Sequence, residues 1–184
     1  MQKTLKRVIG ASVVVVSGIV LVGCGKTSSG VQQTATIMEQ ADISSLDSTM
    51  ITDVGALETV NNSEEGLYRM KNSTTVTPGI AKAIVKPTNG QTVYTFKLRK
   101  NLKWSNGDAL TANDFVYSWR RAVNPTSKAA DAYMFLPIKN AKQIENGKMS
   151  VNKLGIQAVN KTTFKVTLSE PTPYFKYLVA SVPF

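Results

Sequence analysis

The sequence predicts an α+β domain in which short helices alternate with strands. Three local patterns carry this prediction: an alternating apolar run at 93–99, a capped amphipathic helix that starts at Ala112, and two apolar runs joined by a two-residue turn at 160–161. Residues 24–184 are enough for one domain with a hydrophobic core.

The first 23 residues have the pattern of a secretory signal peptide. A basic cluster at 3–7 precedes an apolar run at 8–22, which is shorter than the roughly 20 residues that span a bilayer. The run ends in Leu21-Val22-Gly23-Cys24, which resembles the bacterial lipobox. This resemblance implies cleavage before Cys24 and a lipid anchor on its sulfur. The alternative is an uncleaved membrane anchor that contains a cysteine by chance.

Residues 24–36 are expected to form a flexible tether. They are rich in Ser, Thr, Gln and Gly, a composition that buries little apolar area. Order is expected to begin near Thr36. Together with the signal sequence, this arrangement predicts a protein held at the cell membrane by a lipid, on the extracellular face.

The centre of the chain predicts a turn followed by a half-buried strand. Asn89-Gly90 is a turn signal, and the run at 93–99 alternates so that Tyr94, Phe96 and Leu98 share one face. A second turn is expected at 105–108.

A capping box predicts the helix that comes next. Thr111 and Asp114 are spaced as the N-cap and the third helical residue, so the helix begins at Ala112, and Pro125 ends it. Its apolar residues recur at helical spacing along one face, as expected for a stripe packed on the core: Phe115, Val116, Trp119, Ala122 and Val123.

The remainder predicts a helix, a hairpin and a final helix. The helix is expected at 136–144, and the hairpin pairs strands at 154–159 and 163–168. Thr172-Pro173 has the chemistry of an N-cap and first turn, which predicts a helix through 174–179.

Composition argues against an enzyme. The sequence contains no histidine and one cysteine, so it offers no Ser-His, Cys-His or zinc-ligand arrangement. Glu64-Glu65 is an adjacent acidic pair, but neighbours in a regular element point apart, and we interpret the pair as solvated. No enzymatic activity, metal or cofactor is therefore expected.

Charge is unevenly distributed along the chain. Residues 25–68 carry one Lys and seven acidic residues, whereas residues 69–184 carry 18 Lys or Arg and five acidic residues. The basic residues are scattered, without an arginine-rich tract, and the signal sequence directs the protein outside the cell, so no nucleic-acid partner is expected. A basic face over an anionic membrane or cell wall is the better explanation.

Several short segments identify a family when they are taken together. In chain order they are Glu65-Gly66-Leu67-Tyr68-Arg69, Pro78-Gly79-Ile80-Ala81, the run from Tyr94 to Lys100, the run from Lys103 to Asp108, the run from Thr111 to Arg121, and Leu168-Ser169-Glu170-Pro171 before Pro173-Tyr174-Phe175. They resemble the oligopeptide-binding lipoproteins of bacterial ABC importers, over about 140 residues. The agreement with the lipobox strengthens the resemblance.

The resemblance implies the N-terminal part of a two-lobed periplasmic-binding-protein-like fold, with a mixed sheet and short helices. Residues 37–78 would be the opening segment of the first lobe, and residues 79–184 an extra α+β domain with the start of the return to that lobe. Proteins of this family are roughly three times as long. The chain is therefore expected to be incomplete, and weak or inactive in binding alone.

The resemblance also implies the partners and the site. Oligopeptides would bind in extended form, and permease subunits of the importer would accept the loaded protein. Glu65, Gly66 and Leu67 resemble the segment that lines the peptide cleft, and Tyr133 lies close to another contact. The alternatives remain open: Glu65 as a solvated loop charge, and Gly66 as a turn residue that needs positive φ.

Two more residues are expected to have a structural role, and two alternative functions remain open. Trp104 and Asp108 are interpreted as scaffold. A surface lipoprotein that acts as an adhesin or peptide sensor without transport is the second functional hypothesis. A secreted enzyme that depends on carboxylates is a distant third.

Overall fold

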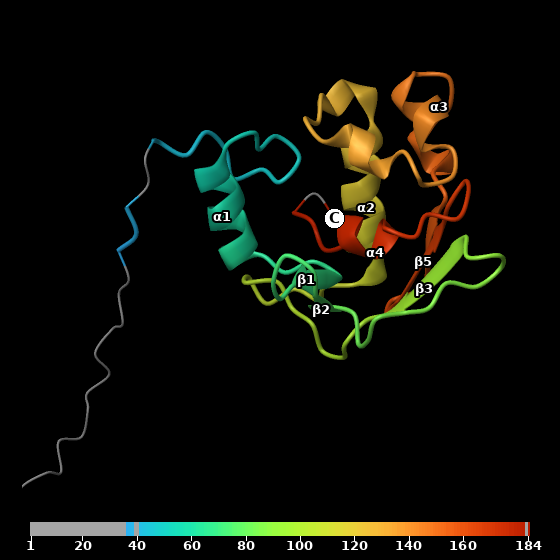
Figure 1. The fold of residues 1–184 in the computed structure, drawn as a ribbon, viewed down its shortest axis with the longest axis horizontal. Coiled ribbons are helices and arrows are strands. Elements are labelled where there is room, and N and C mark those ends of the chain that lie inside the picture. The colour runs from blue at the N-terminus through green and yellow to red at the C-terminus, as the bar shows by residue number, and fades with distance from the viewer. Residues whose placement is uncertain (1–35, 39–40, 183) are drawn as a thin grey trace, which may run out of the picture. The chain divides into compact units, whose positions relative to one another are not determined.

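The computed structural model describes residues 36–38, 41–182 and 184 (Figure 1). The chain divides into two compact units, Met1–Met38 and Glu39–Phe184. In the first unit, the described residues 36–38 are exposed and have no regular structure. All the helices and strands of the described residues belong to the second unit, which is the subject of the following paragraphs.

The second unit confirms the α+β class. Its helices are α1 (Val54–Ser63), α2 (Ala112–Val123), α3 (Ala141–Glu145) and α4 (Phe175–Leu178), with short 3-10 turns η1 (Pro125–Ser127), η2 (Ala132–Phe135) and η3 (Val151–Lys153). Its strands are β1 (Tyr68–Met70), β2 (Val76–Pro78), β3 (Val93–Lys97), β4 (Ile156–Asn160) and β5 (Thr163–Thr167). They form an antiparallel pair β1-β2 and an antiparallel sheet in the order β3-β5-β4.

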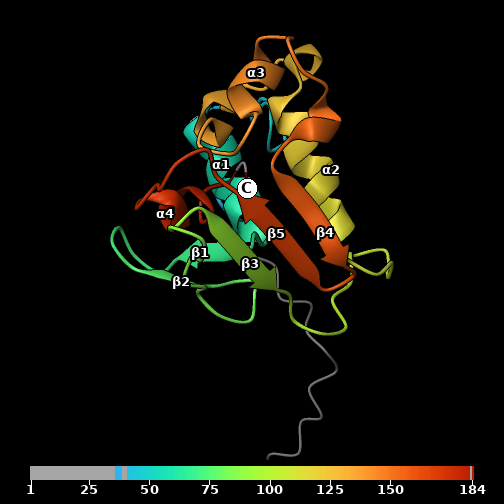
Figure 2. The ribbon, with the colours of Figure 1, turned by 90° about the vertical axis from the view of Figure 1, so that its right-hand side faces the viewer.

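The three-stranded sheet packs one face on α2 (Figure 2). Tyr94 and Phe96 of β3 point to this face, opposite Val166 and Phe164 of β5, and all four are buried. This is the alternation that the strand pattern predicted. Leu98, just past β3, continues the buried row and bridges to Ala81.

Helix α2 begins and ends where its capping residues predicted. The Thr111 side chain accepts a hydrogen bond from the Asn113 N–H, and the Asp114 carboxylate accepts from the Thr111 N–H at 2.7 Å. Trp119 lies at the centre of the buried stripe, where its ring contacts Phe164, with centroids 4.9 Å apart. Its indole Nε1 is buried and has no hydrogen-bond partner among the described residues.

Two predicted helices are wrong in extent. The expected helix at 136–144 is reduced to α3, which starts only at Ala141, because Ile138 bridges to Leu168 and Asn140 takes a left-handed conformation with φ 70°. Thr172 does not cap α4: its hydroxyl donates to the Glu170 carbonyl, and α4 starts at Phe175 without a side-chain cap. The predicted hairpin is confirmed as β4-β5, with a register shift between Ala158 and Asn160.

An ion pair joins the segment before α1 to α2. Arg121 donates both Nη groups to the Asp47 carboxylate, one of them at 2.7 Å, and Asp47 also accepts from the Thr49 N–H and hydroxyl. The Arg121 guanidinium, with the Thr49 donors, holds the pKa of Asp47 well below its ordinary value. The pair is a third exposed, so solvent screens part of its energy.

We expect Arg121→Ala to lower the free energy of unfolding by about 1 kcal/mol at neutral pH, because a bidentate but partly exposed ion pair is lost. The lowered pKa of Asp47 means that the folded state resists its protonation. The pair therefore stabilises the fold above the ordinary aspartate pKa of about 3.9, and its contribution is lost as the pH falls through and below that value. Urea unfolding of both proteins at several pH values should show the difference shrinking in acid; a constant difference would contradict this account.

Candidate functional site

An extended segment at 64–67 links α1 to β1. The Glu64 N–H donates to the Val60 carbonyl at 2.8 Å and ends α1, and the Glu64 backbone is already extended, with φ −116° and ψ 160°. The following residues continue into Tyr68, the first residue of β1. This is the segment in which the sequence placed three of its four predicted peptide contacts.

One edge of the segment is paired within the protein. The Gly66 carbonyl accepts from the Ile80 N–H at 2.9 Å, and the Leu67 carbonyl accepts from Gly79 and Ala81 at 3.0 and 3.1 Å. The two backbones approach so closely that a Cβ on Gly79 would lie 2.5 Å from the Gly66 carbonyl oxygen. Only glycine fits at position 79 without a shift of the segment.

The amide groups of the same segment are not used in this pairing. The N–H groups of Gly66 and Leu67 make no hydrogen bond to any described residue. The backbone of Phe184 lies beside them, since its carbonyl oxygen is 3.7 Å from the position that a Gly66 Cβ would take. An extended ligand could accept hydrogen bonds from such donors as an added strand does.

A cavity of about 650 Å³ opens next to this segment. Its volume lies in the range of small-molecule and peptide side-chain pockets. The wall combines residues of α1, the extended segment, the loop around Trp104, α2 and the last described residues. The lining residues include Glu64, Glu65, Gly66, Arg69, Arg99, Trp104, Asp114 and Phe184.

Charged side chains in the cavity wall form ion pairs. The Glu65 carboxylate forms an ion pair with Arg99 and lies 4.0 Å from Arg69. Arg69 also donates to the Asn61 carbonyl at 3.1 Å. These side chains are a third to a half exposed, so the pairs contribute at most about 1 kcal/mol to stability and can exchange for a charged ligand.

Glu64 is an acidic residue of the cavity wall, and its pKa is raised above the ordinary value. Desolvation raises its pKa, and the negative charge of Asp47 raises it further. Glu65 is paired with arginine, whereas Glu64 lies near another acid, Asp47. A positively charged ligand amine that binds near Glu64 would stabilise the ionised form of this carboxylate.

Trp104 supplies the large apolar surface at the rim. Its side chain is 48 % exposed, and its indole N–H donates to the Asp114 carboxylate at 3.3 Å. Asp114 is already fixed by the capping box of α2, so the ring has a defined position over the cavity. The interpretation of Trp104 as scaffold therefore missed its place in the cavity wall, which depends on a loop that the sequence pattern does not orient.

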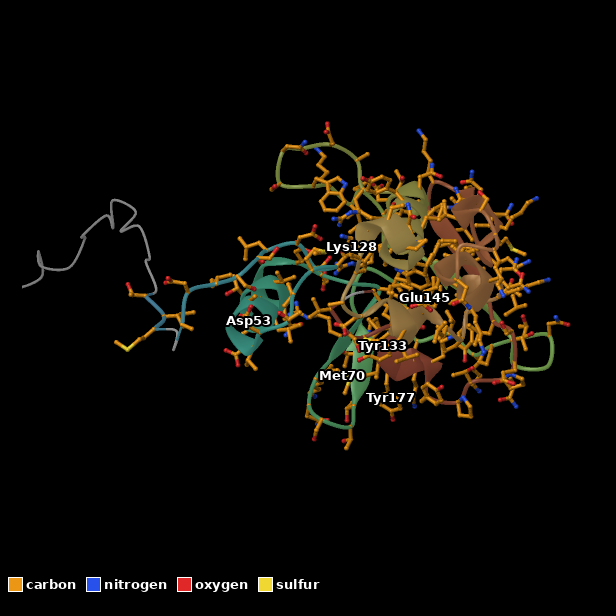
Figure 3. All side chains as sticks on the ribbon, turned by 90° about the horizontal axis from the view of Figure 1, so that it is seen from above. Asp53, Met70, Lys128, Tyr133, Glu145 and Tyr177 are labelled. Atoms are coloured by element: carbon orange, nitrogen blue, oxygen red, sulfur yellow. The ribbon has the colours of Figure 1, made fainter. Side chains whose placement is uncertain are left out.

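The structure brings together two of the four predicted peptide contacts. Glu65 and Gly66 line the cavity, whereas the Leu67 side chain is fully buried in the core, so only its backbone is available. Tyr133, labelled in Figure 3, belongs to η2, is 61 % exposed and is not part of the cavity wall. The alternative of a positive φ at Gly66 is wrong, because the left-handed glycines of the described residues are 90, 107 and 147.

The other predictions concern the lipid anchor, metal binding and membrane-spanning helices. Cys24, the predicted lipid anchor, lies outside the described residues. Among the described residues, no group of three or more carboxylate, thiol or imidazole side chains lies close enough together to hold a metal ion. No helix there has both the length and the apolar character that crossing a bilayer demands.

Comparison with known proteins places this arrangement in context. The chain is 45 % identical to a dipeptide-binding protein of Lactococcus lactis subsp. cremoris over 175 residues, which is 95 % of this chain and 32 % of the relative. Its fold is similar to that of Listeria monocytogenes OppA bound to peptide, with a TM-score of 0.76 and 46 % identity over 79 % of this chain and 28 % of that one. The pheromone receptor PrgZ, solved to show its mode of peptide binding, gives a TM-score of 0.73 and 36 % identity over 76 % and 27 %.

The chain thus spans about a third of the length of these relatives. A family model for bacterial extracellular solute-binding proteins, family 5, middle region, matches residues 75–184, the larger part of the chain. The chain belongs to the bacterial extracellular solute-binding proteins of family 5.

Proposed function

We propose that this chain is part of a peptide-binding lipoprotein subunit of an ABC oligopeptide importer. The observation that carries the proposal is the extended segment beside the cavity, in which the carbonyls of Gly66 and Leu67 are paired internally while their N–H groups are not. An extended peptide would add as a strand on the side of the segment that is not paired within the protein, with its side chains over the cavity. The similarity to proteins named for dipeptide and oligopeptide binding supports the proposal.

The proposal includes weak binding by this chain alone. The relatives are about three times as long, and a peptide that is enclosed on every side gains contacts that one wall cannot supply. Loss of a few buried hydrogen bonds and one charged contact, at ~1–3 kcal/mol each, moves a micromolar site to the millimolar range or beyond.

Titration with short mixed peptides, followed by NMR of the backbone amides, tests the proposed site. We expect the amide signals of Gly66 and Leu67 to shift with an apparent Kd on the order of millimolar, because these N–H groups gain an acceptor. Tyr133→Ala, at the fourth proposed contact, should reduce the affinity, whereas Tyr174→Ala, at an equally exposed tyrosine, should not. Saturation near micromolar peptide, or shifts that avoid residues 65–67, would show that the site is misplaced.

The proposal places the protein on the extracellular face of the cell membrane, with an acyl anchor at Cys24. The lipobox resemblance and the short apolar run before it support this placement. One acyl chain gives marginal binding, whereas two or more give stable anchoring, at about 0.8 kcal/mol per buried CH₂.

Cys24→Ala should release the protein from membrane anchoring or leave its precursor unprocessed, because the sulfur that carries the lipid is gone. Membrane fractionation and mass measurement of the mature N-terminus distinguish these results from the wild type. Ser28→Ala, in the expected tether, is the matched control and should leave processing unchanged. A Cys24→Ala protein that is cut at the same place and stays on the membrane would contradict the lipoprotein proposal.

A peptide sensor without transport is the second candidate function. The structural similarity to a pheromone receptor favours it. Uptake of a labelled peptide by cells that lack this chain separates the two, since an importer subunit is needed for uptake and a sensor is not. Permease subunits are the proposed partners only in the first case.

A further inference from the structure

Three Asn-Gly sequences occur in the described residues, at 89–90, 106–107 and 146–147. Asn followed by Gly is the pair most prone to spontaneous deamidation, because the glycine nitrogen can attack the asparagine side-chain amide with little steric hindrance. The reaction requires an amide nitrogen that can lose its proton, a side-chain amide that can turn toward it, and room for a ring to close.

The turn at Asn106-Gly107 is closed to the reaction. The Gly107 N–H donates to the Trp104 carbonyl at 2.9 Å, so the attacking nitrogen is engaged. The Asn106 side chain is held on both sides by Asp108, whose carboxylate accepts from Nδ2 at 2.8 Å and whose N–H donates to Oδ1 at 3.0 Å. Both reacting groups must break hydrogen bonds before they can meet.

The turn at Asn146-Gly147 is partly closed. The Gly147 N–H donates to the Ile144 carbonyl at 2.8 Å at the end of α3. The Asn146 N–H also bonds to the Lys142 carbonyl, at 3.2 Å, which fixes the backbone of the reacting residue. The Asn146 side chain is exposed.

The turn at Asn89-Gly90 is open on every count. Neither the Gly90 N–H nor the Asn89 side-chain amide bonds to a described residue, and both residues are exposed. A Cβ added at Gly90 would meet no atom within 4 Å, and the same holds at Gly107 and Gly147, so hydrogen bonding and not free space separates the three turns. Asn89, Gly90 and Gln91 have successive φ values of 50°, 62° and 65°, an unfavourable left-handed run for the two residues with side chains.

We propose that Asn89 is the site of spontaneous deamidation in this protein, through a succinimide formed with Gly90. The Gly90 nitrogen bonds to the Asn89 Cγ, and Nδ2 leaves as ammonia with the proton that the Gly90 nitrogen gives up. Water then opens the ring at either carbonyl. The products are aspartate, or isoaspartate in which the main chain runs through the former side chain.

The modification acts on the base of β3. Thr88 and Val93 exchange two backbone hydrogen bonds, at 2.8 and 3.1 Å, and the Asn89 carbonyl accepts from the Thr92 hydroxyl at 2.7 Å. Isoaspartate adds one methylene to the backbone inside this closed turn and breaks its geometry. Either product adds a negative charge within the basic part of the chain, residues 69–184.

Tryptic peptides separate the three candidates within one sample. Cleavage after lysine or arginine gives 83–97, 104–120 and 143–148, each with one Asn-Gly, since the bond between Lys86 and Pro87 resists trypsin. The purified chain is incubated at mildly alkaline pH, digested and measured by mass spectrometry. We expect deamidation of 83–97 to be about tenfold faster than that of 104–120, as the loss of one or two hydrogen bonds in the slower turn implies. Peptide 143–148 should fall between them.

The same incubation in urea tests whether the fold sets the order. The three rates should converge when the hydrogen bonds are absent, and Asp108→Ala should accelerate 104–120 in the folded protein. Asn89→Gln should abolish the fast signal of 83–97. Equal rates in the folded protein, the fastest rate in another peptide, or an order that persists in urea would overturn the proposal.

Discussion

Replacing Trp119 with alanine should lower the free energy of unfolding by about 3–5 kcal/mol, the usual cost of deleting a buried large aromatic side chain. Trp119 is fully buried and touches three aromatic rings, with centroids 5.8 Å from Phe135, 4.9 Å from Phe164 and 5.0 Å from Phe184. Since whole domains are stable by only ~5–15 kcal/mol, much of the variant should be unfolded in mild urea.

Two control variants separate the ring from its polar group. Tyr117→Ala removes an aromatic side chain that is 73 % exposed on the same helix, and should change stability little. Trp119→Phe keeps a ring but removes the buried Nε1 donor, which has no partner among the described residues and costs about 1–3 kcal/mol when desolvated. It should therefore be much less harmful than alanine. Urea unfolding monitored by circular dichroism measures all three, and a loss below about 1 kcal/mol for Trp119→Ala would contradict the packing account.

Gly79→Ala should destabilise the protein by roughly 2 kcal/mol and move the candidate peptide-binding segment, because overpacking of a close contact typically costs ~1–3 kcal/mol. The new Cβ would lie 2.5 Å from the Gly66 carbonyl oxygen, and this neighbour is backbone that cannot rotate away. The hydrogen bonds that Leu67 accepts from Gly79 and Ala81 would lengthen. Amide chemical shifts of residues 65–67 and urea unfolding report the two effects.

Gly66→Ala is the matched control on the opposite side of the same contact. Its Cβ would meet no described atom closer than 3.5 Å, which is ordinary van der Waals contact, and its φ is not left-handed. We expect nearly unchanged stability. If both alanine variants lost the same stability, the close approach at Gly79 would not be the cause.

The elements that the sequence predicted are those whose determinants lie within a few residues. The capping box at Thr111 and Asp114 defines the start of α2, and the alternation at 93–99 defines the buried face of β3. The hairpin β4-β5 is joined by a turn in which the Asn160 side chain accepts from the Thr162 N–H at 3.0 Å. Local chemistry and tertiary packing agree at all three places, so a local pattern is sufficient.

Helix α1 shows what a local pattern misses. It contains Gly55 and two consecutive asparagines, Asn61 and Asn62, which are poor helix formers. Asp53 caps it, with its carboxylate accepting from the Ala56 N–H at 2.8 Å, but most of its support comes from packing of Ala56 and Val60 with Ile51. Strands β1 and β2 have three residues each, too few for any alternation to be recognised.

The candidate site was predictable only in part, for the same physical reason. The family resemblance located Glu65 and Gly66, but Arg99 reaches Glu65 across 34 positions of the chain, and Trp104 meets Asp114 only because a loop folds back on α2. No periodic pattern in the sequence predicts either pairing. Arg99, at the exposed end of the β3 run, was the available signal in the sequence. A cation just past a buried strand indicates a carboxylate partner elsewhere in the chain.

The order of strands in the sheet bears on how the chain folds as it is synthesised. β3 sits at an edge, and its one strand neighbour is β5, so Lys97 pairs with a residue 66 positions later. At synthesis rates of roughly 5–20 residues per second, the apolar face of β3 waits several seconds for its partner to emerge. Closing so long a loop also slows folding relative to a hairpin. Before β5 is synthesised, Val93–Lys97 has no strand partner. A chaperone that shields this segment at that stage should raise the yield of folded protein more than one that acts on the hairpin, whose two strands emerge together.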